Sequence, residues 1–235
     1  MLKIENTEVV GWEAAIRGMR NPMNSWAKSD SRWEPQFDKV QGPVAGEFVI
    51  GQNDYTLMKN LRNSGTDHRK FMRMITVYLD ITAPLYWWKE FDTYKVGTVA
   101  NSCSTMHKIH AKEFTLEDFS CEHLIDVDAC QGIEMVDVCG IMHTSFGVFL
   151  ETINALNVFR KLYLSSNDKK YWWQMIQLLP SSYNQKRTVM LNYEVLANIY
   201  KSRKNHKLDE WHTFCEWIES LPYSELIIGK TDGAK

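Results

Sequence analysis

Two segments of the sequence concentrate the side chains that could bind a ligand or take part in catalysis. The first, residues 93–108 (TYKVGTVANSCSTMHK), is dense in hydroxyl and amide groups: Thr93, Thr98, Asn101, Ser102, Ser104 and Thr105. Turns rich in Ser, Thr and Gly can present successive backbone N–H groups to a phosphate. Neither G-x-x-x-x-G-K-S/T nor G-x-G-x-x-G occurs in it, so the segment is either an unconventional ligand loop or an ordinary polar turn.

The second segment, residues 187–204 (RTVMLNYEVLANIYKSRK), is predicted to be a helix. At about 100° per residue, Asn192 and Arg203 would lie about 20° apart around that helix and roughly 16 Å apart along its axis. An amide at one end of a helix face and a guanidinium at the other suit a long, two-part ligand. In the alternative interpretation, Asn192 is a polar rim residue and Arg203 complements the helix dipole.

A zinc site is a further interpretation, because four candidate ligands occur at loosely acceptable spacings: His107, His110, Cys121 and His123. The flanking residues show no zinc-finger or zinc-ribbon pattern, and we expect no metal. The five cysteines, Cys103, Cys121, Cys130, Cys139 and Cys215, include no C-x-x-C pair. Reduced thiols in the cytoplasm are the simplest interpretation.

Charge and hydropathy limit the possible partners of the chain. Its 235 residues carry a formal net charge of −2, so bulk affinity for nucleic acid is not expected. The basic run KSRKNHK (residues 201–207) is most simply a solvated face, with nucleic-acid binding as the alternative. No apolar run reaches the roughly 18 residues that span a bilayer, and the first residues have no apolar signal core, so no membrane association is expected.

The expected elements alternate between strands and helices and then become mostly helical. Strands are predicted at 1–12 and 73–84, helices at 13–21, 53–65, 84–94, 145–166, 168–180, 187–204 and 207–222, irregular structure at 22–46, and short helical turns at 115–119 and 122–126. Asn53 or Asp54 is expected to cap the second of these helices and Gly65 to end it. No linker is evident, so residues 1–235 are predicted to form one α/β domain with a helical C-terminal half.

Two blocks of the sequence, residues 68–108 and 178–211, together resemble the flavin-dependent thymidylate synthases. His68 falls on the first histidine of the family pattern, and the strand ending at Ala83-Pro84 follows in step. Counted from Leu179-Pro180, Asn192 and Asn198 fall on two family asparagines and Arg203 on the arginine that follows them.

The resemblance implies a fold, a reaction and an assembly. It implies helices packed on a mainly antiparallel sheet, and homotetramers whose sites form between subunits. It implies methylation of dUMP to dTMP with FAD, NADPH and methylenetetrahydrofolate, by a thymidylate-synthase-like methyltransferase. The implied FAD-binding residues are His68, Lys95, Thr98, Asn101, Asn192 and Asn198. The implied dUMP-binding residues are Ser102, Cys103, Ser104, Lys186, Arg187 and Arg203, and Arg203 is the catalytic residue, which favours the anionic form of the uracil ring.

The chain departs from the family pattern at several charged positions. Thr93-Tyr94-Lys95 stand where the family has R-H-R, and Met106 replaces its last arginine. Glu194 stands where the family has an arginine near FAD, and Arg73 where it has an acid. Because lysine lacks the bidentate fork of arginine, Lys95 does not reproduce a phosphate clamp. A second hypothesis is therefore a non-catalytic member of the fold that binds a nucleotide or a protein.

Overall fold

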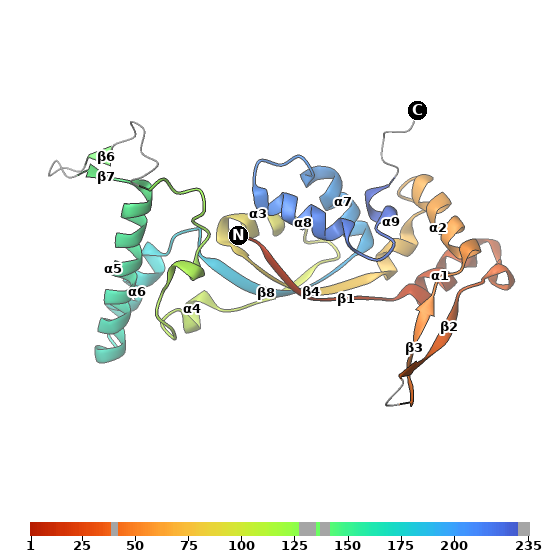
Figure 1. The fold of residues 1–235 in the computed structure, drawn as a ribbon, viewed down its shortest axis with the longest axis horizontal. Coiled ribbons are helices and arrows are strands. Elements are labelled where there is room, and N and C mark those ends of the chain that lie inside the picture. Colours follow the sequence, from red (N-terminus) through yellow and green to blue (C-terminus); the bar gives the residue numbers. More distant parts are fainter. Residues whose placement is uncertain (39–41, 127–134, 137–141, 230–235) are drawn as a thin grey trace. The chain divides into compact units, whose positions relative to one another are not determined.

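The computed structural model describes residues 1–38, 42–126, 135–136 and 142–229 (Figure 1). The strands are β1 (Lys3–Val10), β2 (Arg32–Asp38), β3 (Gly42–Val49), β4 (Thr76–Pro84), β5 (Val99–Ser102), β6 (Met135–Val136), β7 (Met142–His143) and β8 (Asn184–Asn192). The α-helices are α1 (Trp12–Arg20), α2 (Gln52–Asn63), α3 (Leu85–Phe91), α4 (Thr105–Lys108), α5 (Ser145–Ser166), α6 (Lys169–Leu178), α7 (Tyr193–Arg203), α8 (Asp209–Glu219) and α9 (Glu225–Ile228). Short 3-10 helices are η1 (Asn21–Met23), η2 (Trp26–Lys28), η3 (Lys70–Met74) and η4 (Leu116–Asp118).

The predicted α/β fold class, with an antiparallel sheet and a helical C-terminal half, is confirmed. The principal sheet has the strand order β1-β4-β8-β5, and β2–β3 and β6–β7 form two-stranded antiparallel pairs. The chain divides into two compact units, which we describe separately. Unit 1 comprises residues 1–3, 81–93 and 101–187, and unit 2 comprises residues 4–80, 94–100 and 188–235.

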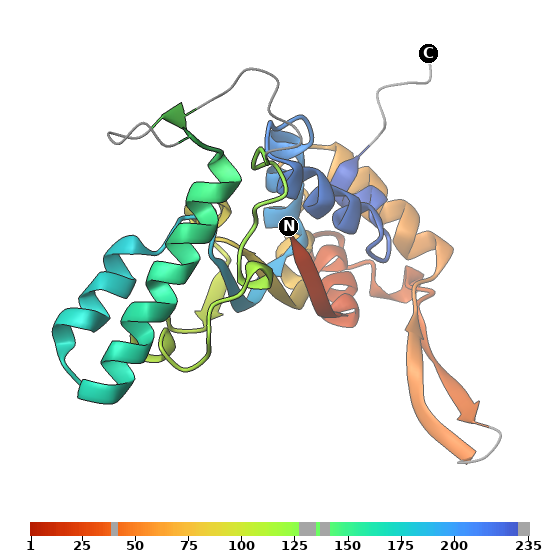
Figure 2. The ribbon, with the colours of Figure 1, turned by 60° about the vertical axis from the view of Figure 1, so that its left-hand side comes forward.

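In unit 1, α5 and α6 lie side by side and enclose an apolar cluster (Figures 1 and 2). The cluster includes Phe119, Phe149, Leu156 and Met175, all buried. The sequence predicted the bounds of α5 correctly. The Thr144 hydroxyl accepts a hydrogen bond from the Gly147 amide and fixes the start of this helix. Within the described residues, no helix is long and apolar enough to cross a membrane.

In unit 2, α7 packs against α8, α9 and η3. The first five residues of α7 and Ile199 are buried, and Leu196 and Ile199 are fully buried. The buried Trp211 and Phe214 supply the facing side of α8. The Tyr193 hydroxyl donates to the Pro222 carbonyl at 2.5 Å, and burial raises the pKa of this phenol, so it stays a neutral donor. The hydrogen bond to Pro222 anchors the first residue of α7.

The prediction of a helix over residues 187–204 is wrong in its first third, which is the end of strand β8. Burial in β8 alternates, with Gln185, Val189 and Leu191 inward, and this period of two identifies a strand. Asn192 then ends the strand in an extended conformation and starts α7 as its N-cap. The strand predicted at 73–84 is confirmed as β4, in which the alternating apolar residues Val77, Leu79 and Ile81 are buried.

Residues 22–46, predicted to be irregular, contain most of the β2–β3 hairpin (Figure 1). Three prolines and several small residues masked the strand pattern there. The register shifts between Glu34 and Gln36, which flank Pro35. Proline cannot donate a ladder hydrogen bond and is tolerated at such irregularities. Of the helical turns predicted at 115–119 and 122–126, the first is confirmed by η4, whereas the second is only a turn at residues 122–123. Residues 127–134 and 137–141 lie outside the described residues.

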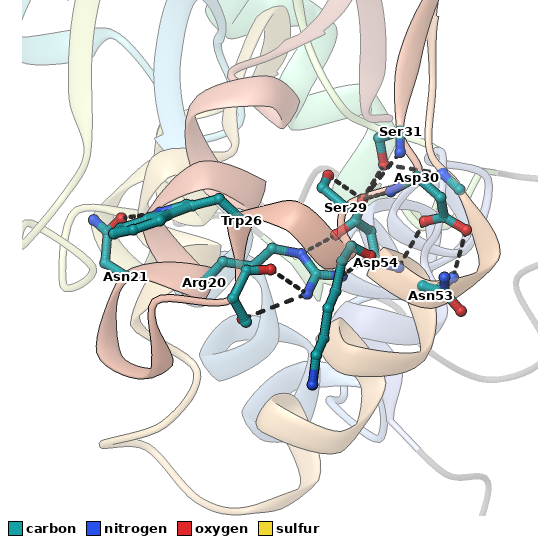
Figure 3. Close-up of polar contacts among 11 residues, drawn as sticks. Arg20, Asn21, Trp26, Ser29, Asp30, Ser31, Asn53 and Asp54 are labelled. Carbon is teal, nitrogen blue, oxygen red and sulfur yellow. Dashed lines mark hydrogen bonds and ion pairs between the residues drawn. The ribbon is translucent and has the colours of Figure 1, made fainter.

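Helix α2 is capped from outside, and not by Asn53 or Asp54 as predicted. The Asp30 carboxylate accepts hydrogen bonds from the Asn53 amide at 2.9 Å and the Asp54 amide at 3.1 Å (Figure 3). A Cβ on the N-cap residue Gly51 would lie 2.2 Å from the Asp30 carboxyl carbon, so glycine is required there. The prediction that Gly65 ends this helix agrees with the structure, since α2 ends at Asn63 and Gly65 follows with a positive φ.

The Asp54 side chain lies in a buried polar network between α1, α2 and the segment before β2 (Figure 3). It accepts hydrogen bonds from Arg20 Nε at 2.6 Å, the Ser29 hydroxyl at 2.7 Å and the Ser31 hydroxyl at 2.6 Å. Arg20 is 4% exposed and Asp54 is fully buried. Burial alone would raise the pKa of the Asp54 carboxyl, but these three partners outweigh it and the pKa is lowered.

Candidate functional site

Arg203, the predicted catalytic residue, is the last residue of α7 and its side chain is held by two aromatic residues. Its Nε donates a hydrogen bond to the Tyr94 hydroxyl at 2.9 Å. The guanidinium carbon lies 4.7 Å from the centroid of the Trp211 ring and 5.6 Å from that of Tyr94. Cation–π attraction and this hydrogen bond together restrict the guanidinium to one orientation. A cation oriented in advance is suited to stabilising negative charge that develops on a ligand.

Asn192 lies at the other end of α7, outside the helix, so the prediction that it shares a helical face with Arg203 is wrong. Its side-chain oxygen accepts a hydrogen bond from the Val195 amide at 3.0 Å, which makes it the N-cap. Gly97 approaches it closely, with a φ of +78° and an ideal Cβ position only 2.9 Å from Asn192 Nδ2. The loop that carries Lys95 and Thr98 therefore lies against the start of α7.

Thr98 has a buried polar group without a partner in the described part of the chain. Its hydroxyl oxygen is inaccessible to solvent and makes no hydrogen bond within the described residues. Buried hydroxyls are almost always paired, and an exception calls for an explanation such as an absent ligand or water. Lys95 beside it is exposed.

The capping role of Asn192 predicts the effect of its substitution. Asn192→Ala removes the acceptor for the Val195 amide and should lower the free energy of unfolding by about 1 kcal/mol. Asn192→Asp keeps an acceptor and should retain most of the stability. Chemical denaturation of the two variants beside the wild type checks this. Equal stability of Asn192→Ala and wild type would show that the cap contributes nothing.

A pocket in unit 2, which we call the α2–α7 pocket, has a volume of about 920 Å³. Asn198, one of the predicted cofactor ligands, lines it. The remaining lining residues come from α2, the loop after it, α7 and α9: Arg62, Asn63, Gly65, Thr66, Arg69, Ala197, Tyr200, Lys201, Lys204, Ile227 and Ile228. Four of these residues are cationic and none is acidic, so the pocket is suited to an anion.

The charges around the α2–α7 pocket are only partly compensated. Arg69 pairs with the buried Glu194 at 2.9 Å, and its Nη2 lies 3.4 Å from the Asn198 side-chain oxygen. Arg62 donates to the carbonyls of Leu226 and Ile227, each at 3.1 Å. Burial lowers the pKa of the Arg62 guanidinium, and the charge of Arg69 lowers it further, against the opposing effect of Glu194.

The basic run at residues 201–207 divides between two places in unit 2. Lys201 and Lys204 line the α2–α7 pocket, whereas Arg203 contacts Tyr94 and Trp211. Lys207 is exposed and lines neither. The sequence therefore showed that the two lysines belong to a basic run, but it did not indicate that they line a pocket.

His68, a predicted FAD ligand, does not line the α2–α7 pocket. It lines a second hollow of about 710 Å³ in unit 2, whose walls include Met19, Phe71 and Met74. The residue after it, Arg69, lines the α2–α7 pocket instead. The sequence analysis named His68 as a site residue and did not single out Arg69.

The predicted nucleotide residues of unit 1 lie at the end of β5, in the segment after it and on β8. The Cys103 amide donates to the Lys186 carbonyl at 2.9 Å, and Gln185 Nε2 donates to the Cys103 carbonyl at 2.7 Å. Cys103 and Lys186 are thus adjacent. The Ser104 hydroxyl caps α4 by accepting from the His107 amide, while Asn101 and Ser102 are exposed.

Arg187 joins this group through the side chain of Gln185, whose oxygen accepts from Arg187 Nε at 3.0 Å. Its guanidinium lies 4.1 Å from the Trp88 ring centroid and its Nη1 lies 2.8 Å from Asp92. Arg187 is therefore an oriented cation already paired with one carboxylate. An anionic ligand would have to share it with Asp92.

The four candidate zinc ligands, His107, His110, Cys121 and His123, do not form a metal centre in the described part of the chain. No group of three or more His, Cys, Asp or Glu side chains there could hold an ion. His110 packs its ring against Tyr163 instead. Cys103, Cys121 and Cys215 form no disulfide, and Cys130 and Cys139 lie outside the described residues.

Fold and site together define an α/β protein with a basic pocket and an oriented arginine at the end of a helix. No protein-family model and no curated protein matches the sequence. Solved structures do match. Thymidylate synthase X from Helicobacter pylori, solved with FAD and dUMP, is 15% identical over 96% of each chain, with a TM-score of 0.63. The UMP/dUMP methylase PolB from Streptomyces cacaoi, solved with 5-Br UMP, is 12% identical over 93% of this chain and 87% of that one, with a TM-score of 0.56. At these identities the likeness is one of fold.

Proposed function

We propose that this protein is a flavin-dependent enzyme that methylates a pyrimidine nucleotide, converting dUMP to dTMP with methylenetetrahydrofolate and NADPH. The observation that carries the proposal is the oriented guanidinium of Arg203, in a chain that shares its fold over nearly its whole length with proteins solved with FAD and dUMP or with a UMP analogue. We further propose that it acts as a cytoplasmic homotetramer with sites shared between subunits.

The cations and hydrogen-bonding groups of unit 2 suit a flavin dinucleotide. The α2–α7 pocket offers several cations and the Asn198 amide, and the buried Thr98 hydroxyl lacks a partner in the described residues. We assign Lys95, Thr98, Asn192 and Asn198 to this cofactor, together with His68 and, from unit 1, Asn101. When bound, the reduced flavin would supply the hydride of the reaction.

We assign the pyrimidine nucleotide to the last residue of β5, the two residues after it and two cations of β8. Ser102, Cys103 and Ser104 would offer hydroxyl, thiol and backbone groups, and Lys186 and Arg187 would offer positive charge to the phosphate. Arg203 would lie at the uracil ring. Its fixed positive charge would favour the ring in its anionic form, which is the reactive form for methylation at carbon.

Ligand binding and complementation test the proposal separately. The purified protein, titrated with FAD, should quench flavin fluorescence at micromolar concentrations, and dUMP should then perturb the flavin spectrum. Expression in a thymidine auxotroph should restore growth without thymidine. If neither FAD nor dUMP binds, the proposed function is wrong. If both bind and growth is not restored, the chain is a non-catalytic nucleotide-binding member of the fold.

A further inference from the structure

We infer that the α2–α7 pocket binds a nucleotide diphosphate group, with Arg69 as the phosphate contact and Glu194 as the residue that positions it. The inference deepens the proposed function, because a flavin dinucleotide carries such a group. It gives Arg69 a role in the site, and it gives the Glu194 carboxylate the role of orienting Arg69.

The pocket carries a surplus of positive charge. Lys201 and Lys204 have no carboxylate partner among the described residues. Glu194 is already paired with Arg69, and Glu219 accepts a hydrogen bond from the Tyr200 hydroxyl at 2.5 Å. Four cations that share one concave surface repel one another, so an anion bound there relieves that repulsion. A phosphate with several oxygens can reach more than one of them.

The geometry of the Arg69–Glu194 pair leaves one part of Arg69 available to a ligand. The two side chains are only 15% and 10% exposed, and Arg69 lines the pocket. Arg69 uses Nε and Nη2 on Glu194, and Nη2 also faces Asn198. Its third nitrogen, Nη1, has no hydrogen-bond partner in the described chain. One edge of the guanidinium is therefore anchored while Nη1 remains for a ligand, an arrangement that fixes the orientation of the planar group.

The burial of Glu194 also places a cation at this surface. Glu194 lies in the first turn of α7 and is buried. A buried carboxylate needs a cationic partner, and Arg69, on the segment before η3, supplies it. The pair therefore holds the Arg69 cation at the pocket, which Arg69 lines.

Calorimetric titration with inorganic pyrophosphate tests the site without catalysis. The wild type should bind the probe, and Lys201→Gln and Lys204→Gln should each weaken binding about tenfold, the loss expected for one charge-assisted contact. Lys207→Gln, from the same basic run but outside the pocket, should bind within about twofold of the wild type, as a residue that makes no contact. Because Arg69→Gln alone leaves Glu194 buried and unpaired, the double variant Arg69→Gln with Glu194→Gln tests the arginine with the fold retained. It should bind at least about tenfold more weakly than the wild type.

Glu194→Gln decides whether Glu194 positions Arg69. If Glu194 acts only through its charge, removing that charge strengthens binding of the anion. If it positions Arg69, the guanidinium is no longer held in place and pyrophosphate binds more weakly. Adding Arg69→Gln to this variant then lowers the affinity by less than the sum of the losses in the two single variants. Tighter binding by Glu194→Gln would overturn the positioning role. Unchanged melting temperatures of the variants exclude unfolding as the cause.

The outcomes separate this inference from the proposed function. If pyrophosphate binds and the lysine and arginine variants weaken it while FAD does not bind, the diphosphate site stands and the flavin proposal fails. If FAD binds equally well to the wild type and to all pocket variants and pyrophosphate does not bind, the inference is overturned and the proposed function is untouched.

Discussion

Replacing Arg203 with alanine should abolish growth of a thymidine auxotroph that the wild-type protein rescues. The structure fixes this guanidinium between Tyr94 and Trp211 at the end of α7. A preorganised donor to developing negative charge is worth about 10²–10³ in turnover, and we expect at least a 100-fold loss in purified enzyme. Arg203→Lys keeps the charge but loses the planar fork and the hydrogen bond of Nε, so it should recover only part of the activity.

Controls distinguish catalysis from folding in that experiment. Arg203 also packs its stem and guanidinium on aromatic rings, so alanine costs some stability. The melting temperature and the affinity for FAD should be measured for Arg203→Ala and Arg203→Lys beside Lys207→Gln, whose exposed side chain should leave growth unchanged. Full rescue by Arg203→Ala would remove Arg203 from the catalytic role and favour the non-catalytic alternative.

Replacing Asp54 with alanine should destabilise the protein by about 3–5 kcal/mol, because it leaves the buried Arg20 guanidinium without its counter-ion. The hydroxyls of Ser29 and Ser31 would lose their acceptor in the same step. Asp67→Asn, an exposed carboxylate on a nearby loop, is the matched control and should change the free energy of unfolding by less than about 0.5 kcal/mol. Urea denaturation of both variants measures the difference, and equal midpoints would refute the structural role of the network.

The same carboxylate predicts a pH dependence of stability. Its pKa is lowered in the folded protein, so its contribution is present above the ordinary aspartate value of about 3.9 and is lost as the pH falls through the lower folded-state value. The stability difference between wild type and Asp54→Asn should therefore be largest near neutral pH and shrink in acid. A difference that stays constant down to pH 2 would contradict the lowered pKa.

Much of the fold followed from local patterns in the sequence. The alternation of buried Val77, Leu79 and Ile81 identified β4, and the run from Ser145 to Ser166 identified α5. The error at residues 187–204 came from reading a strand and the helix after it as one helix. Asn192 was the signal that would have separated them, because Asn is a preferred N-cap residue.

The candidate site was less accessible to sequence reasoning than the fold. Arg203 could be named because it falls on the arginine of the family pattern that the sequence resembles. Arg69 and Glu194 are 125 positions apart in the chain, and nothing local indicates that they meet. The cap of α2 was missed for the same reason, since Asp30 reaches it from a separate segment. Contacts that depend on tertiary folding leave no local periodicity to read.

The Arg69–Glu194 pair has a consequence for the history of this chain. Two largely enclosed side chains of opposite sign cannot change one at a time without leaving one charge unpaired or bringing two like charges together. Homologues should therefore vary at positions 69 and 194 in concert. Sequences with arginine at 194 should have a neutral or acidic residue at 69, and the two arrangements should mark separate branches of the lineage.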